Sequence, residues 1–348
     1  MKAQIVEKGL IDCFEDGLCT PDGKPVHAEI SAVVYDGVKL IFGSDKPVPG
    51  NWRSDVFSII YNENGIQPGT IKYYTASPIK IAAKFEDFAL TPDRKYVIAT
   101  TGFDRIKSDS AEFDTYNTLL VWPLDKPNAA KIVSPSTRGG VTSSTTLRKN
   151  ISEALNGAPY FKIEGLTAIE GNEKGKDGRL LIGVREVGTS HEDFEYVVQV
   201  ISVPYKIEND ELVFTEDFEL IYNYDPGEQD EITRAIGLSS IEYDLYANRM
   251  FLLTSFEEKD ASRKKILGGY LLVLSMEDFN AGNPPTLVAN QDGMPLEFAD
   301  KSEGIAVLSE KRAFIVFDND RILDIDGGKN GDSRKPNQAP YAILEFEN

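Results

Sequence analysis

Short apolar stretches separated by polar turns recur along the chain, and five of them share one arrangement. Each begins with an acidic residue or its counterpart, continues as a strand of small and apolar residues, and is followed after a polar turn by a second apolar strand. Small residues mixed into apolar runs are typical of strands that are buried on both faces. The five units begin at Glu29, Glu86, Glu164, Ile236 and Glu303.

Most units have room for four strands. Successive starts are 57, 78, 72 and 67 residues apart, which suits four strands with long loops. The second strands are predicted at 40–42, 96–99, 180–184, 250–253 and 313–317. The outer strands are predicted at 56–61 and 79–84, 119–122 and 130–133, 196–202 and 218–222, and 270–274 and 286–289.

The two ends of the chain complement each other. The last unit has only three strands, the third at 341–346, whereas residues 3–7 form an unassigned strand at the opposite terminus. Pairing the two would close a ring and remove an exposed sheet edge. We therefore predict an all-β fold, a five-bladed β-propeller whose N-terminal strand pairs with the C-terminal blade, as one domain over 1–348. Two packed β-sandwiches would explain neither the repeat nor the matching ends.

One segment departs from the blade pattern. Residues 134–159 are rich in Ser, Thr and Gly, and then show a helical period at Leu147, Ile151 and Leu155 before Gly157. We predict a loop and short helix inserted between the second and third blades. Both a lid over the channel and a loop without a role remain open.

Composition restricts the partners. The chain has 37 basic and 56 acidic residues and a net charge of −19, which repels nucleic acid and favours cations or basic partners. A solvated acidic surface explains the same surplus. No apolar run is long enough to span a membrane, and we expect a monomer. The N-terminus has no signal-peptide core, so the protein is cytoplasmic, or secreted or periplasmic if a signal was removed. Cys13 and Cys19 are the two cysteines; a disulfide and two free thiols both remain open.

The chemistry is predicted at one end of the central channel. In a propeller, the start of each inner strand lies beside the finish of the next strand. Clustered carboxylates repel one another unless cations neutralise them. Oxygen ligands select Ca²⁺, with Mg²⁺ or Mn²⁺ second. Glutamates that cap backbone amides of the neighbouring blade are the alternative. The predicted metal ligands are Glu29, Glu86, Glu164, Glu303, Asp45, Asp104 and Asp318.

Other motifs contribute less. Residues 324–332 are similar to a calcium-binding loop but lack its third acidic position and final glutamate, so a turn is favoured. The chain has two histidines, and no serine-hydrolase, zinc-protease or Walker motif. His27 would lie near the channel end, either as a proton donor or as a hydrogen-bonded loop residue.

Two segments carry a resemblance. Residues 162–167 with 180–185, and 302–306 with 317–320, resemble the esterase-like, phytase-associated propeller proteins. The resemblance implies calcium-assisted phosphoester hydrolysis and transfers to Glu164, Arg185, Glu303 and Asp318. Ile236 departs from the acidic pattern. In blade number and acidic inner strands the chain is more loosely similar to calcium-activated nucleotidases of the apyrase type.

These observations predict a calcium-dependent hydrolase of phosphoesters or phosphoanhydrides. Its catalytic residues would be Glu164, Arg185 and Glu303, with the metal polarising a phosphoryl oxygen and Arg185 stabilising the developing charge. The ligand would be a small phosphorylated molecule. One alternative is a non-catalytic propeller that binds a protein or small ligand, with a structural cation. A second is a glycosidase that uses channel carboxylates as acid and base.

Overall fold

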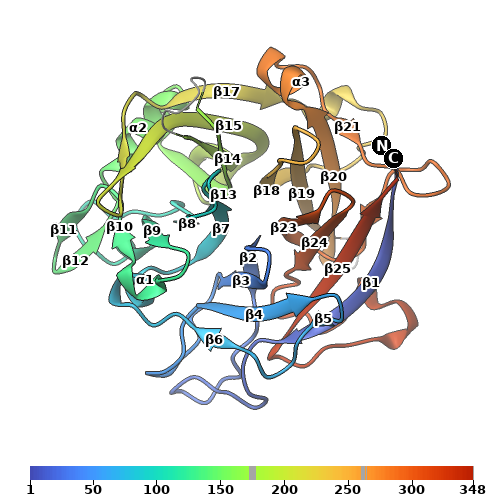
Figure 1. Cartoon of the computed structure of the whole chain (residues 1–348), viewed down its shortest axis with the longest axis horizontal. Helices are drawn as coiled ribbons and strands as arrows, with labels where there is room; N and C mark the ends of the chain where they lie inside the picture. Colours follow the sequence, from blue (N-terminus) through green and yellow to red (C-terminus); the bar gives the residue numbers. More distant parts are fainter. Residues whose placement is uncertain (172–177, 260–262, 264, 348) are drawn as a thin grey trace.

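The chain forms five β-sheets arranged around a central axis (Figure 1). The computed structural model describes residues 1–171, 178–259, 263 and 265–347. The innermost strands contact one another in cyclic order, and the last of them contacts the first, so the ring is closed. The predicted five-bladed propeller is confirmed. The innermost strands are β2 (Ile30–Tyr35), β7 (Phe85–Leu90), β13 (Tyr160–Ile169), β18 (Gly237–Asp244) and β23 (Ser302–Ser309).

Three or four further antiparallel strands extend each blade outward. Blade 1 has β3 (Lys39–Ser44), β4 (Val56–Asn62), β5 (Gly65–Ile66) and β6 (Lys72–Tyr73); blade 2 has β8 (Tyr96–Thr101), β9 (Leu119–Pro123) and β10 (Lys131–Ile132). Blade 3 has β14 (Arg179–Ser190), β15 (Asp193–Glu208), β16 (Glu211–Phe214) and β17 (Glu219–Tyr224). Blade 4 has β19 (Arg249–Lys259), β20 (Lys265–Ser275), β21 (Thr286–Leu287) and β22 (Glu297–Phe298), with α3 (Met276–Ala281) after β20.

Blade 5 joins the two ends of the chain. It consists of β23, β24 (Arg312–Phe317), β25 (Gln338–Phe346) and β1 (Ala3–Asp12). β1 and β25 run antiparallel, from Ala3 opposite Phe346 to Asp12 opposite Gln338. The closure predicted from the matching termini is confirmed, and the hydrogen-bonding edge of β25 is covered.

One predicted strand is wrong. Residues 79–84 were expected to complete blade 1, but the first three belong to the short helix α1 (Ser77–Ile81), the other three are in no strand, and β6 pairs with β4 instead. Pro78 lies in the first turn of α1, where its missing N–H costs no helical hydrogen bond. The apolar residues of this segment, such as the buried Ile79, therefore pack from a helix rather than from a strand.

The buried side chains form five clusters, one between each pair of neighbouring blades. Between blades 5 and 1, Phe42 lies 5.4 Å from Phe57 and 6.0 Å from Phe314, measured between ring centroids. Ile11 of β1 belongs to the same cluster. Hydrophobic packing between blades therefore holds the ring together.

The inserted segment is part of one of these clusters. It contains the hairpin β11 (Ser136–Arg138) and β12 (Val141–Ser143), followed by α2 (Leu147–Ala154). Leu147, Ile151 and Leu155 are buried between blades 2 and 3. Arg148 donates hydrogen bonds to the Phe103 carbonyl and to Asn117 Oδ1, the latter at 2.8 Å. No helix in the described ranges has the length and apolar character needed to cross a membrane.

Closure of the ring can be tested within β1. Ile11 is 1% exposed, whereas Val6 is 41% exposed at a bulge in the same strand. We expect Ile11→Ala to lower the free energy of unfolding by about 2–5 kcal/mol, because it leaves a cavity between blades 5 and 1. Val6→Ala should change it by less than about 0.5 kcal/mol. Urea unfolding measures both, and equal effects would contradict a closing role for β1.

Candidate active site

Each innermost strand contains a β-bulge near its start, at the same place in all five blades. Its pairing with the second strand of the blade skips one residue there. A bulged residue is left out of the ladder and its side chain is redirected, which is common beside active sites. These residues surround one end of the channel, here called the mouth. They are Ser31, Glu86, Glu164, Ser239 and Glu303.

The bulges correct the alignment of the repeats. Glu29 and Ile236 were treated as the counterparts of Glu86, but they precede the bulges of their blades by two and three residues. The equivalent residues are Ser31 and Ser239. Ile236 is therefore not an interruption of an acidic series, since the mouth has three glutamates and two serines at this position.

Three lysines that the sequence analysis overlooked neutralise these glutamates. Lys84 Nζ lies 3.2 Å from Glu86 Oε1, and Lys301 Nζ lies 2.6 Å from Glu303 Oε1. Lys162 contacts Glu164 in the same way. Each lysine precedes its glutamate by two residues, a spacing that places side chains on the same side of a strand. The Lys-x-Glu pattern in blades 2, 3 and 5 was the signal that could have revealed them.

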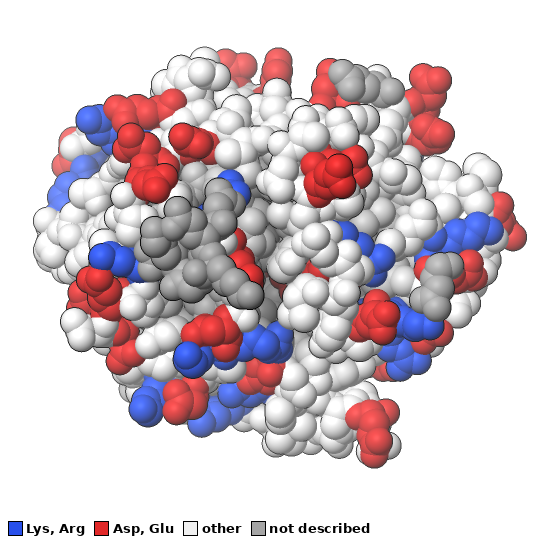
Figure 2. Space-filling model, turned by 45° about the horizontal axis from the view of Figure 1, so that its top comes forward, with Lys and Arg blue, Asp and Glu red and all other residues white. Residues whose placement is uncertain are grey.

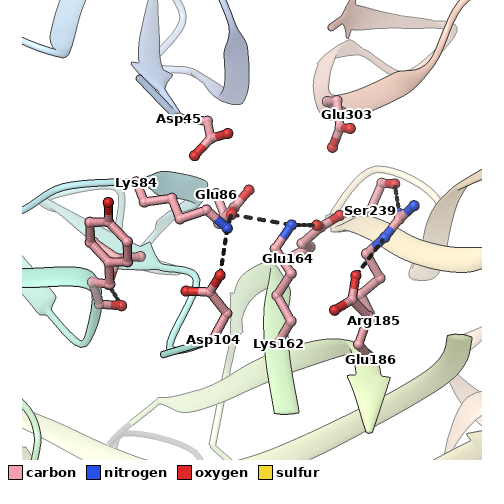
Figure 3. Close-up of polar contacts among 12 residues, drawn as sticks. Asp45, Lys84, Glu86, Asp104, Lys162, Glu164, Arg185, Glu186, Ser239 and Glu303 are labelled. Carbon is pink, nitrogen blue, oxygen red and sulfur yellow. Dashed lines mark hydrogen bonds and ion pairs between the residues drawn. The ribbon is translucent and has the colours of Figure 1, made fainter. Parts of the chain in front are cut away.

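Lys162 also connects neighbouring blades (Figure 3), since its Nζ lies 3.4 Å from Glu86 Oε1 of blade 2. Within blade 2, Lys84 Nζ is 2.9 Å from Asp104 Oδ2. Glu86 and Glu164 are only 3% and 1% exposed. Charges buried this deeply are tolerated only when they are paired and hydrogen-bonded. Ion pairs therefore connect the carboxyl groups of blades 2 and 3, whereas Glu303 of blade 5 pairs with Lys301.

Arg185 links blades 3 and 4. Its Nη1 is 3.1 Å from Glu164 Oε2 and donates to the hydroxyls of Ser239 and Ser255, each at 2.8 Å. Gly237 leaves room for this side chain, because a Cβ there would lie 2.7 Å from Arg185 Cγ. Arg185 is thus fully engaged by protein groups.

The carboxyl groups of the mouth differ strongly in acidity. Burial raises the pKa of Glu86 to about 8 despite Lys162 and Lys84. Burial also opposes ionisation of Asp45, but Lys84, Lys46 and Lys162 outweigh it and hold its pKa at about 2. The Asp45 side chain is 17% exposed and its Oδ1 accepts no hydrogen bond from the described residues. At neutral pH, Glu86 therefore carries a proton and Asp45 is ionised.

The pKa values of the other carboxyl groups also depend on burial, which raises them, and on neighbouring cations, which lower them. Burial opposes ionisation of Glu164 and of Asp104, but their cationic neighbours hold both pKa values below the ordinary ones. For Glu303, burial prevails over Lys301, and the pKa is raised.

A second group of carboxylates lies between blades 5 and 1. Oxygens of Glu29, Asp318 and Asp320 all lie within 4.8 Å of one another. Burial raises the pKa of Asp318 well above its usual value, although Lys301 opposes this, and the nearby Glu29 and Asp320 raise it further. Lys46 lies 3.6 Å from Glu29, and Lys265 lies 2.8 Å from Asp320. Among the described residues, this is the only cluster with three potential metal ligands.

The structure thus divides the predicted ligands. Glu86, Glu164 and Glu303 are paired with lysines, and Asp45 and Asp104 are paired with Lys46 and Lys84. Glu29 and Asp318 lie together with Asp320, which was not among the predicted ligands. The roles predicted for these residues in metal binding, and for Glu164, Arg185 and Glu303 in catalysis, stay predictions.

Two further features are structural. In the loop at 324–332, Asp300 accepts a hydrogen bond from the Asp326 amide at 2.8 Å and so anchors the loop from outside, consistent with a turn. Cys13 is buried and Cys19 is exposed, and both are free thiols.

Figure 2 shows acidic and basic side chains interspersed over much of the face in view.

Comparisons with known proteins give no family. No family model matches the chain, and no curated protein matches it. The resemblance to esterase-like, phytase-associated propellers and the predicted phosphohydrolase activity therefore gain no support.

Several solved structures have a similar chain path. One is an exo-beta-1,3-galactanase from Bifidobacterium bifidum, named as putative, with 11% identity over 94% of this chain and 91% of that one, and a TM-score of 0.42. An alpha-L-arabinofuranosidase from Podospora anserina has 11% identity, coverages of 95% and 94%, and a TM-score of 0.42. An aldose sugar dehydrogenase from Streptomyces coelicolor is 10% identical over 98% of this chain and 99% of that one, with a TM-score of 0.39.

The pairing of the mouth can be tested at Lys162, which contacts Glu164 and Glu86. We expect Lys162→Met to lower the free energy of unfolding by about 3–5 kcal/mol, because it breaks a buried ion pair and leaves Glu164 with Arg185 and Glu86 with Lys84 as their remaining cations. Adding Glu164→Gln to this variant should recover part of the loss. Urea unfolding of the two single variants and the double variant measures the coupling, and a cost below about 1 kcal/mol for Lys162→Met would contradict the pairing.

Proposed function

We propose that the protein hydrolyses glycosidic bonds, with Glu86 as general acid and Asp45 as the ionised partner. The observation that carries this proposal is the opposite shift in acidity of two carboxyl groups at one mouth, with pKa values of about 8 and about 2. Pairs of carboxyl groups whose environments separate their pKa values identify the acid and the base of a glycosidase.

Each residue has a defined task in this proposal. Glu86 transfers its proton to the glycosidic oxygen as the bond to the anomeric carbon breaks. Asp45, whose buried Oδ1 accepts no hydrogen bond from the described residues, acts as a base towards water or as a nucleophile. Lys84 and Lys162 hold Glu86 in place, since both lie within 3.4 Å of its Oε1. Glu164 and Arg185 fix Lys162 and blade 4, and so act as positioning residues.

The leaving group of the substrate distinguishes the two roles. We expect Glu86→Gln to lower kcat/KM by about 10²–10⁴-fold on a natural glycoside, because the departing alkoxide then lacks a proton. On a dinitrophenyl glycoside, whose leaving group needs no proton, the loss should be small. Asp45→Asn should impair both substrates. Asp22→Asn, in an exposed pair with Lys24, is the matched control. Equal losses on both substrates for Glu86→Gln would contradict its role as the acid.

The rate should also depend on pH in a predictable direction. Because the pKa of Glu86 is raised to about 8, the acid is protonated below that pH and loses its proton above it. We expect kcat/KM on a natural glycoside to fall as the pH rises through about 8, while Asp45 stays ionised down to about pH 2. In Glu86→Gln, the decline near pH 8 should be absent. A wild-type decline centred near pH 4–5 would contradict the assignment.

A cation site is a second candidate function, favoured by Glu29, Asp318 and Asp320. Their oxygens lie close enough to share one ion, and the raised pKa of Asp318 reflects charges that a divalent cation would compensate. Three carboxylates with water or carbonyl oxygens fit Ca²⁺, which accepts six to eight oxygen ligands in irregular geometry. Such an ion would fix blades 5 and 1 and is separate from the Glu86–Asp45 pair.

Thermal unfolding tests the cation site. We expect Ca²⁺ to raise Tm, with stabilisation of about 2.7 kcal/mol at a hundredfold excess over Kd. Asp318→Asn should abolish the calcium-dependent part, whereas Asp22→Asn should retain it. A Tm that does not respond to Ca²⁺, Mg²⁺ or Mn²⁺ would contradict a cation here.

A further inference from the structure

A cavity lies at the end of the central channel opposite the mouth. It has a volume of about 570 Å³, and all five blades contribute to its wall, for example through Tyr35, Arg94, Thr167, Glu242 and Val307. Tyr35, Thr167, Glu242 and Val307 lie in the second halves of the innermost strands, whereas the glutamates of the mouth lie at the starts. On each strand, three or four residues separate the bulged residue of the mouth from the residue that lines the cavity, which is about 10–13 Å along the strand. The cavity is thus distinct from the mouth.

Its polar groups face a common space. Glu242 Oε1 accepts a hydrogen bond from the Val307 amide at 3.4 Å, and Arg94 Nη2 donates to the Tyr35 carbonyl at 2.9 Å. Burial raises the pKa of Glu242 to about 8, with Arg94 opposing this only in part. A protonated Glu242 can both donate and accept a hydrogen bond, and the guanidinium of Arg94 supplies further donors.

Tyrosine side chains provide the apolar surface of the cavity. Tyr35 and Tyr243 line it, and their hydroxyls donate to the Gly37 carbonyl at 2.8 Å and to Asn248 Oδ1 at 3.0 Å. These bonds fix the orientation of the two rings. Tyr246 also lines the cavity and is 54% exposed, so its ring is available to a ligand. Tyrosine gives rigid, amphipathic contact area at low entropic cost.

The balance of charge restricts the ligand. Arg94 and Arg179 contribute two positive charges, and Glu170 and Glu242 are the two carboxyl groups of the wall. With Glu242 protonated, as its raised pKa implies, two arginines face the carboxylate of Glu170, so the net charge of the wall is small and a strongly charged ligand gains little here. Flat aromatic rings beside groups that donate and accept hydrogen bonds suit a neutral molecule with apolar faces and hydroxyl edges.

We propose that this cavity is a second ligand site, which binds a neutral polyhydroxylated ring the size of a mono- or disaccharide. The site requires no catalysis at the mouth, and its occupancy is independent of whether Glu86 acts as an acid. It would give the protein a carbohydrate-binding function at the far end of the channel.

Calorimetric titration of the intact protein tests the proposal. The probes are glucose, galactose, xylose, arabinose and cellobiose, and we expect at least one of them to bind. Tyr246→Ala should weaken that binding by about 10-fold through loss of the ring, and Tyr246→Phe, which keeps the ring, by no more than about threefold. Arg94→Ala should weaken it by about 10- to 100-fold through loss of charged hydrogen bonds.

Variants at the mouth separate this site from the proposed hydrolysis. Glu86→Gln should leave the binding unchanged, and Tyr246→Ala, at an exposed position, should leave the unfolding temperature and any glycoside hydrolysis unchanged. The proposal is overturned if none of the probes binds to the wild-type protein. It is equally overturned if Glu86→Gln abolishes binding while Tyr246→Ala preserves it, because the ligand would then occupy the mouth.

Discussion

The structure depends on neutralising carboxylates that lie in the low-dielectric centre of the ring. Glu86, Glu164 and Glu303 are each at most 3% exposed. An isolated ionised carboxylate at such a depth would cost more free energy than the whole fold contributes. Glu164 avoids this cost through Lys162 and Arg185, whereas Glu86, whose pKa is raised to about 8, avoids it by keeping its proton beside Lys84 and Lys162. The inner ring is therefore held by charge pairs as well as by the five apolar clusters.

The bulges explain how one short pattern can provide both charges. A regular strand would keep the glutamate within the hydrogen-bonded ladder, whereas the bulge leaves it out and turns its side chain towards the axis. The lysine then approaches the same carboxylate from the strand start. Where a blade has serine at the bulge, the serine carries no charge and forms no ion pair. In blade 4, Arg185 reaches across from blade 3 to Ser239 and Ser255.

Much of the fold was readable from the sequence, and less of the site. The repeat and the unmatched strands at the two ends predicted five blades and their closure, because both are periodic or complementary properties of the chain. The equivalence of Glu29 and Glu86 was wrong, since a bulge shifts the register by one residue and cannot be seen in an apolar pattern. The strand predicted at 79–84 was wrong because a short apolar run is compatible with a helix as well as with a strand. The pairing of Lys162 with Glu86 connects two blades and depends on their packing.

The same pairing bears on which substrates the mouth can accept. Asp45, Glu86, Asp104, Glu164 and Glu303 each have a cationic group within 3.2 Å. A phosphorylated substrate would need cations that these carboxylates already occupy, and a metal bridging them would have to displace buried lysines. A neutral sugar makes neither demand, because its hydroxyls can accept from ammonium groups and donate to carboxylates without breaking an ion pair. The balance of charge at the mouth thus agrees with the proposed glycoside hydrolysis, and within the described ranges three possible cation ligands come together only at Glu29, Asp318 and Asp320.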